Sequence, residues 1–328
     1  MKKILFIIFI TVLLNSCKKE FSDSFTPYTS MGINDTVWTN KPLTGSFIDS
    51  VSASLNNSIW FIDSFNIASE KKYKLNDSLE LSFPAHYYVF PNTNSPGLIP
   101  DGNIKVEFLT LQKKGDYIKA LIPVSSNNYL LETTGSFFVR LSRNGQKVVM
   151  APNYGFNIKW RDDYPKTNMK FFEGFSTPNR DSLFTWLPAA MDGYISVWDS
   201  TSSGVNKKGY QMTSKNTDWI SSCYFLDTTK TTRLNVTLPL NFTNKNSFVF
   251  AVVNDKKTVV RLTTDFSTRS FYCLNVPVNT SVTLLSISLI DNTYYLGTRT
   301  VTVNNADRFT LTPTKSTPIK IISVLDNL

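Results

Sequence analysis

The sequence contains one histidine, His86, and three cysteines, and this shortage limits the chemistry that it can support. A Ser-His-Asp or Cys-His system would have to use His86, which lies among aromatic residues, and no G-x-S-x-G segment occurs. Too few nitrogen and sulfur ligands are present for a zinc site. We therefore expect no metal or other cofactor, and we interpret His86 as a buried or turn-lining residue.

Paired carboxylates suited to acid/base chemistry are also scarce. Asp162 and Asp163 are adjacent, and adjacent side chains on an extended chain point in opposite directions. They are better interpreted as the start of a turn before Pro165. We expect a protein that is not an enzyme, with no catalytic residues, and a glycoside or peptide hydrolase is the least favoured alternative.

Long apolar runs are missing after residue 14. Lys2 and Lys3 precede an apolar segment from Ile4 to Leu14, which is the order of an export signal. A membrane-spanning helix needs roughly 20 apolar residues, and this segment is shorter. The sequence therefore predicts a signal peptide rather than a transmembrane anchor.

The end of this segment, Leu14-Asn15-Ser16-Cys17, resembles the lipobox of bacterial lipoproteins. The resemblance implies cleavage after residue 16 and acylation of Cys17, whose acyl chains would attach the protein to a lipid bilayer. The alternative is an ordinary signal peptide with an incidental cysteine. Position 18 is Lys rather than the Asp that retains lipoproteins in the inner membrane, so we expect the outer membrane, at its cell-surface or periplasmic face.

Residues 17–36 are polar and contain Pro27 and Gly32, and we expect a flexible tether there. Loss of Lys2 and Lys3 lowers the formal charge from +9 to +7. The lysines lie in scattered pairs near predicted turns, at 71/72, 113/114, 207/208 and 256/257. This scatter favours a solvated surface over an anion-binding site and argues against a nucleic-acid partner.

Alternation of apolar and polar residues dominates the rest of the chain. Residues 104–108 and 234–242 each place apolar side chains on one face, and Asp101-Gly102, Lys114-Gly115-Asp116 and Asn144-Gly145 predict turns. The pattern predicts an all-β protein with two consecutive β-sandwich-like domains, Ig-like or transthyretin-like, over residues 37–160 and 191–328. Residues 316–328 predict a short C-terminal helix, with Ser316 as its cap, or a last strand.

Residues 161–190 have the weakest alternation and are the expected connection between the domains. Their aromatic residues argue against a free linker, so we expect the connection to be ordered and packed; these residues are Phe171, Phe172, Phe175, Phe184 and Trp186. Cys223 and Cys273 lie in strand-like segments of a chain expected to be exported. The sequence leaves open whether they form a disulfide or are two separately buried thiols.

Aromatic residues make up 13% of the chain and are either core fillers or sugar-stacking platforms. The candidates are Trp38, Trp60, Trp160, Trp186, Trp198 and Trp219, together with one ring each from Tyr87-Tyr88 and Tyr294-Tyr295. For any one tryptophan, the core is the favoured interpretation.

Residues 102–148 resemble a segment that recurs in uncharacterised two-domain lipoproteins of Gram-negative bacteria. The shared features are the strand Gly102–Glu107, the turn Lys114–Asp116, the link Ser126–Gly135 and the hairpin Asn144–Val148. The resemblance implies an architecture and no activity. We expect a non-catalytic structural or interaction module of the envelope that contacts an envelope protein; the alternative is a glycan-binding module, similar to the surface lipoproteins of starch utilisation.

Overall fold

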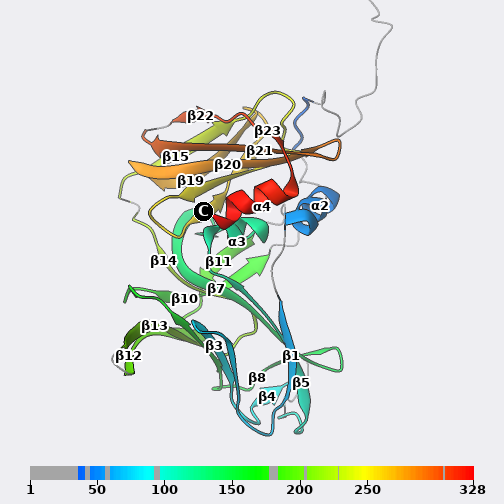
Figure 1. The fold of residues 1–328 in the computed structure, drawn as a ribbon, viewed down its shortest axis with the longest axis vertical. Helices are drawn as coiled ribbons and strands as arrows, with labels where there is room; N and C mark the ends of the chain where they lie inside the picture. Colours follow the sequence, from blue (N-terminus) through cyan, green and yellow to red (C-terminus); the bar gives the residue numbers. More distant parts are fainter. Residues whose placement is uncertain are drawn as a thin grey trace, which may run out of the picture.

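The computed structural model describes residues 36–40, 45–55, 60–91, 97–176, 184–202, 205–227, 229–305 and 307–328. The predicted signal peptide, Cys17 and all of the predicted tether except Thr36 lie outside these residues. The described chain forms two β-sandwich-like modules, with three short helices gathered between them at a waist (Figure 1). The expected all-β fold and C-terminal helix are confirmed.

The N-terminal module consists of two facing sheets. The large sheet has the order β1 (Phe61–Asn66), β5 (Asn103–Leu111), β7 (Tyr129–Arg143), β14 (Asp218–Phe225), β10 (Lys170–Ser176) and β11 (Phe184–Pro188). Short strands β6 (Ser125–Ser126) and β8 (Gln146–Met150) pair with β7, and β4 (Tyr88–Val89) pairs with β8. The second sheet, here called the outer sheet, has the order β12 (Gly193–Ser202), β13 (Val205–Ser214), β9 (Phe156–Arg161), β3 (Leu79–Phe83) and β2 (Lys71–Asn76).

Alternating apolar residues build the core between these two sheets. On β5, Ile104, Val106 and Phe108 are buried, as the sequence predicts. They pack in one cluster with Leu81 and Ile158 of the outer sheet. The β7–β8 hairpin turns at Asn144 and Gly145, which have φ of 51° and 79°, and this is the turn that the Asn-Gly pair predicts.

The C-terminal module has a four-stranded sheet with the order β18 (Thr263–Asp265), β19 (Ser270–Pro277), β15 (Thr231–Thr237) and β22 (Arg308–Thr310). It faces a five-stranded sheet with the order β17 (Val259–Arg261), β16 (Ser247–Val253), β20 (Thr280–Ile290), β21 (Thr293–Val303) and β23 (Thr314–Ser316). The paired strands are antiparallel except for β15 and β22, which are parallel.

Strand β16 of the five-stranded sheet is buried on both faces, so it is apolar without alternation. Val249 and Ala251 face the core of the C-terminal module, whereas Phe248 and Phe250 face the waist. The helices cover the waist side; they are α2 (Gly45–Leu55), α3 (Lys114–Lys119) and α4 (Pro318–Asp326). The waist is therefore a third apolar core rather than a flexible joint.

The expected boundary between the domains is wrong. Strands β12, β13 and β14 were expected in the C-terminal domain, over residues 191–328. In the structure β13 pairs with β12 and β9, and β14 pairs with β7, so the three strands complete the N-terminal module. The change of module falls between β14 and β15, because alternation along one strand does not reveal which strand lies beside it. Residues 161–190 are ordered where described: Phe171, Phe172, Phe184 and Trp186 are buried, and Phe175 is exposed.

Three local expectations also need correction. The strand expected over residues 234–242 ends at Thr237, because Pro239 cannot donate a ladder hydrogen bond, and Leu240 is exposed. Lys114-Gly115-Asp116 begins helix α3 instead of forming a hairpin turn. The cap of α4 is Thr317, whose hydroxyl accepts from the Lys320 amide, and not Ser316.

Candidate functional site

Cys223 and Cys273 are both buried free thiols, which is one of the two alternatives that the sequence leaves open. Cys223 belongs to the waist core and Cys273 to the core of the C-terminal module. Burial raises the pKa of each thiol to about 12, so both are protonated and unreactive near neutral pH.

His86 and the two adjacent aspartates serve turns. His86 has φ of 65°, is half exposed, and its Nδ1 lies 2.8 Å from Asp101 Oδ1. Asp162 Oδ1 accepts from the Tyr164 amide at 2.9 Å, whereas Asp163 Oδ1 pairs with Arg161 Nε at 2.9 Å. The two carboxylates thus have separate local partners, which fits the turn interpretation.

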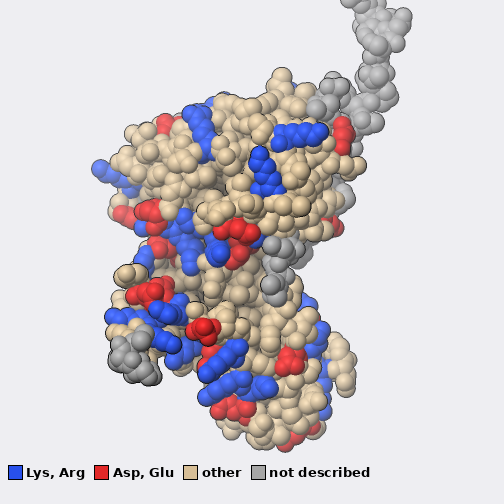
Figure 2. Space-filling view, viewed as in Figure 1, with Lys and Arg blue, Asp and Glu red and all other residues tan. Residues whose placement is uncertain are grey.

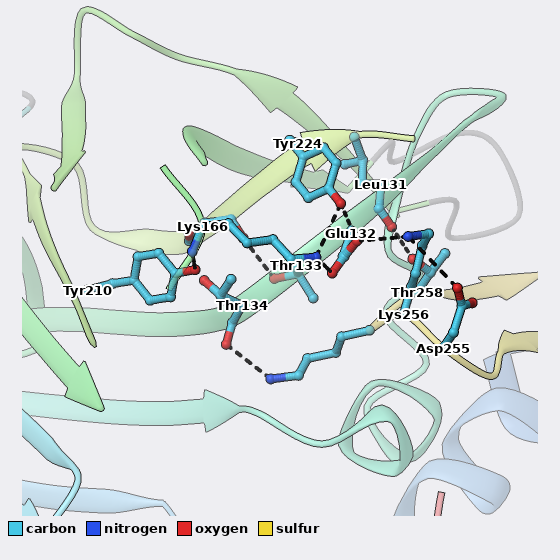
Figure 3. A network of polar contacts seen from close by, with 12 residues as sticks. Leu131, Glu132, Thr133, Thr134, Lys166, Tyr210, Tyr224, Asp255, Lys256 and Thr258 are labelled. Atoms are coloured by element: carbon cyan, nitrogen blue, oxygen red, sulfur yellow. Dashed lines mark hydrogen bonds and ion pairs between the residues drawn. The ribbon is translucent and has the colours of Figure 1, made fainter. Parts of the chain in front are cut away.

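A polar network crosses the waist beside the apolar core (Figure 3). Its centre is Glu132 on β7, whose side chain is only 9% exposed. Glu132 accepts hydrogen bonds from Lys166 Nζ and Tyr224 Oη, and Lys256 Nζ of the C-terminal module lies 3.7 Å from its Oε2. Burial lowers the pKa of Lys166, but its hydrogen bonds to Glu132 and Tyr224 outweigh burial and raise it overall.

The loop between β16 and β17 holds β7 through further hydrogen bonds. Lys257 Nζ donates to the Thr134 carbonyl at 3.2 Å, and Thr258 Oγ1 donates to the Leu131 carbonyl at 2.7 Å. Burial lowers the pKa of Lys257. These polar groups bond to one another and to backbone carbonyls, so the network is a structural joint between the modules.

The outward face of the outer sheet offers a more open arrangement. Gly209 of β13 lies in register between Arg161 of β9 and Trp198 of β12. A Cβ atom at Gly209 would approach the Trp160 carbonyl oxygen to 2.0 Å, so glycine is required for this close pairing with β9. A hollow of about 360 Å³ has Arg161 and Trp198 among its lining residues.

Cations outnumber carboxylates around this hollow. Its lining, here called the basic hollow, consists of Lys74, Asn76, Asp77, Ser78, Leu79, Glu80, Lys159, Arg161, Trp198 and Lys207. The Lys159 ammonium lies 4.2 Å from the centre of the Trp198 ring, and Trp198 Nε1 donates to the Tyr210 carbonyl at 3.0 Å. Figure 2 shows Lys and Arg side chains spread over the N-terminal module, at the bottom of the view, with Asp and Glu among them.

Among the cations of the basic hollow, the sequence singles out only Lys207, in the pair 207/208, and predicts that this pair belongs to a solvated surface. Lys74, Lys159 and Lys207 are far apart in the chain and come together only because β2, β3, β9 and β13 are neighbours in the outer sheet. Alternation places Lys159 and Arg161 on one face of β9, which was the available signal. The order of the strands, which sequence alone did not supply, was the missing information.

Most candidate aromatic platforms belong to cores. Trp160 and Trp186 are buried, and Trp38 packs on Phe271 with ring centres 5.1 Å apart. Tyr88 is buried, and Tyr87, Tyr294 and Tyr295 are half-buried. Trp60 is exposed but packs edge-on against Phe138. Trp198 is half-buried on the outward side of β12, four residues from Tyr194, which is 60% exposed.

A second hollow, of about 300 Å³, lies at the waist between the β6–β7 hairpin, β11 and β17–β19. Its charged lining residue is Arg261, whose guanidinium stacks on Phe248 with the ring centre 5.7 Å away. The basic hollow has the richer set of charged groups.

None of the helices in the described ranges has the length and hydropathy that a membrane-spanning helix requires. The same residues contain no group of three or more His, Cys, Asp or Glu side chains that could hold a metal ion. No family model matches the sequence, and no curated protein matches it either. We therefore choose the candidate site from the geometry of the structure, and it is the outward face of the outer sheet with the basic hollow.

Proposed function

We propose that the chain is a non-catalytic interaction protein of the bacterial cell envelope, held at the outer membrane by acylated Cys17. Support comes from the order of charged, apolar and lipobox-like residues at positions 2–17. Two or more acyl chains anchor a protein stably, so this attachment requires no membrane-spanning helix.

The single observation that carries the proposed role is where residues 36–40 lie. The Thr39 amide donates to Asn244 Oδ1 at 3.1 Å, and Asn244 Nδ2 donates to the Thr39 carbonyl at 2.5 Å. Trp38 packs against the core of the C-terminal module. A chain anchored at Cys17 therefore reaches the C-terminal module first, although the N-terminal module comes first in sequence.

This path gives the anchored protein an orientation. Eighteen residues separate Cys17 from Thr36; fully extended, the chain between these two residues reaches at most about 65 Å. The C-terminal module would then lie nearer the bilayer, and the packed waist would hold the N-terminal module, with its basic hollow, farther out (Figure 1). Such a rigid two-module spacer is suited to presenting a binding surface.

A glycan is the second candidate partner, and one specific feature favours it. Tyr194 and Trp198 share the outward side of β12, beside the polar and charged lining of the basic hollow. An exposed aromatic ring with nearby hydrogen-bonding groups is the arrangement that suits a sugar.

Attachment and exposure are tested by fractionation and proteinase K treatment of intact cells, with lysed cells as the control for cleavability. We expect the wild-type protein in the membrane fraction and the Cys17→Ala variant in the soluble fraction. Cleavage in intact cells would place the protein on the outer surface, and cleavage only after lysis would place it in the periplasm. If the Cys17→Ala protein stays membrane-bound like wild type, the lipid anchor is wrong.

A further inference from the structure

We propose that the basic hollow binds an acidic oligosaccharide, one that carries carboxylate or sulfate groups beside its hydroxyl groups. The proposal rests on the interaction role proposed above and names the ligand class for that surface. The lining supplies three features that together select such a ligand: cations without carboxylate partners, hydrogen-bond acceptors, and an aromatic ring.

The cations of the hollow retain charge that is available to a ligand. Within the part of the chain that the structure describes, Lys74, Lys159 and Lys207 have no carboxylate within 4.0 Å. Lys159 is held over the Trp198 ring instead. Elsewhere on the same module, Lys72 pairs with Glu70 at 3.2 Å and Lys105 pairs with Glu107 at 2.9 Å.

The strand register spaces these charges across the sheet. Lys74 lies opposite Glu80, and Glu80 lies opposite Lys159 on the next strand. Arg161 follows on the same face of β9, although its guanidinium is shared with Asp163. An anionic group would thus find cations on both sides of the hollow rather than one isolated lysine.

The two carboxylates of the hollow argue against a ligand that carries only negative charge. Asp77 and Glu80 line the same space and would repel inorganic phosphate, sulfate or a continuous polyanion. They are, however, good acceptors for sugar hydroxyl groups, as is the amide oxygen of an asparagine. A ligand with both hydroxyl donors and a few negative groups satisfies the whole lining.

Shape and size agree with this class. The hollow, at about 360 Å³, is within the range of small-ligand sites and is open toward solvent on the sheet face. Trp198 adds aromatic surface to the lining, and the Lys159 ammonium over its ring joins this surface to a positive charge.

The test uses the chain from residue 17 onward with Cys17→Ala, so that no lipid is needed. Calorimetry and tryptophan fluorescence follow titration with oligogalacturonate, a sulfated chondroitin oligosaccharide, a neutral malto-oligosaccharide of the same length, and inorganic sulfate. The first two probes distinguish carboxylate from sulfate as the source of the negative charge. The site variant is Lys159→Gln with Lys207→Gln, and the matched control is Lys72→Gln with Lys105→Gln, which removes the same charge.

We expect at least one acidic oligosaccharide to bind, to weaken as salt is added, and to lose about tenfold in affinity in the site variant but not in the control. Equal binding of the neutral oligosaccharide, with no effect of the site variant, would overturn the acidic class while leaving a glycan partner. Inorganic sulfate binding as tightly as the oligosaccharides would reduce the site to an ion site and overturn the proposal. Absence of all binding would overturn it too, whereas the lipid anchor at Cys17 would still be judged separately by fractionation.

Discussion

At the scale of single residues, the two buried cysteines give the most direct check of the cores. Because burial raises the pKa of Cys223 and Cys273 to about 12, neither is a thiolate at pH 8. We expect the native Cys17→Ala protein to react very slowly with a thiol reagent at pH 8. After unfolding in guanidinium, two thiols per chain should react with the reagent, each at the rate of a free cysteine.

The same experiment has a clear contrary outcome. A fast-reacting thiol in the native state would show that one of the cores is open. Fewer than two thiols in the unfolded, unreduced protein would show that the cysteines are oxidised. Reduction before unfolding is the control for a disulfide.

Glu173 on β10 gives a pH-dependent prediction. Burial raises its pKa, although a hydrogen bond from Asn216 lowers it in part. Below pH 4.5, the pKa of this carboxyl in the unfolded chain, Glu173 is protonated in both states and does not lower the free energy of unfolding. As pH rises from there through the higher pKa of the folded state, the free energy of unfolding decreases, because the unfolded chain ionises more readily. Glu173→Gln should therefore be more stable than wild type at pH 7, and this advantage should vanish below pH 4.5.

Urea unfolding at a series of pH values measures this difference. Glu70→Gln, at an exposed position outside the core, is the control and should show no such trend. A Glu173→Gln advantage that persists unchanged below pH 4 would contradict the assigned cause.

The residue scale also shows what sequence could and could not provide. The turn roles of His86 and of Asp162 follow from local sequence, because glycine-like φ values and Asx turns are short-range properties. The burial of Cys223 in the waist depends on strands distant in sequence, so composition left both of its states open.

At the scale of elements, Gly115 explains why α3 and α4 can touch. A Cβ atom at this position would approach the Leu325 carbonyl oxygen of α4 to 1.9 Å. Gly115→Ala should push the two helices apart and destabilise the protein by about 1 to 3 kcal/mol, as overpacking does. Urea unfolding measures the loss.

Gly97→Ala is the matched control, because nothing lies within 4 Å of a Cβ atom placed there. It should change the free energy of unfolding by less than about 0.5 kcal/mol. Equal effects of the two substitutions would mean that α3 and α4 are not closely packed.

Elements with strong local signals were predicted well. β5 follows from alternation, and the β7–β8 turn follows from Asn-Gly. Helix α2 was missed, although Phe47, Val51 and Leu55 recur every four residues and are buried. Its β-branched and serine residues weaken the helical signal, and the waist core that stabilises it is made by distant segments.

At the scale of the whole molecule, the shared waist core predicts that the two modules unfold together. Residues of both modules, such as Phe172 and Phe250, belong to one cluster. Glu132→Ala would leave Lys166 and Tyr224 without their common acceptor. It should lower the free energy of unfolding by about 1 to 2 kcal/mol, and not by more, because Lys166 and Lys256 are partly exposed and water screens their ion pairs. Unfolding should remain a single transition.

Calorimetry and tryptophan fluorescence together report both modules. Glu70→Ala, which breaks an exposed pair with Lys72, is the control and should change the stability little. Two separate transitions in wild type, or a Glu132→Ala effect confined to one of them, would contradict a common core.

The proposed orientation gives a prediction for the lipidated protein in vesicles. A fluorophore at Asn40→Cys, near the tether, should be quenched by nitroxide lipids more strongly than one at Gln146→Cys, on the β7–β8 hairpin of the N-terminal module. Labelling is selective if Cys223 and Cys273 are as unreactive as their burial implies. Equal or reversed quenching would contradict the orientation.

The division into modules was the least predictable level. The pairing of β7 with β14 could not be predicted from the sequence, because these two strands are 75 or more residues apart in the chain. Pairing of that kind depends on strand order rather than on local pattern.

The contact between α2 and α4 also sets an order of events during synthesis. Phe47 and Val51 of α2 pack in the same cluster as Ile321 and Leu325 of α4, from the opposite end of the described sequence. A growing chain must therefore keep the apolar side of α2 uncovered until α4 has been made, and closure over such a separation is slow. During that interval the nascent chain exposes apolar surface that favours aggregation, and a chain that ended before Pro318 would leave this side of α2 uncovered.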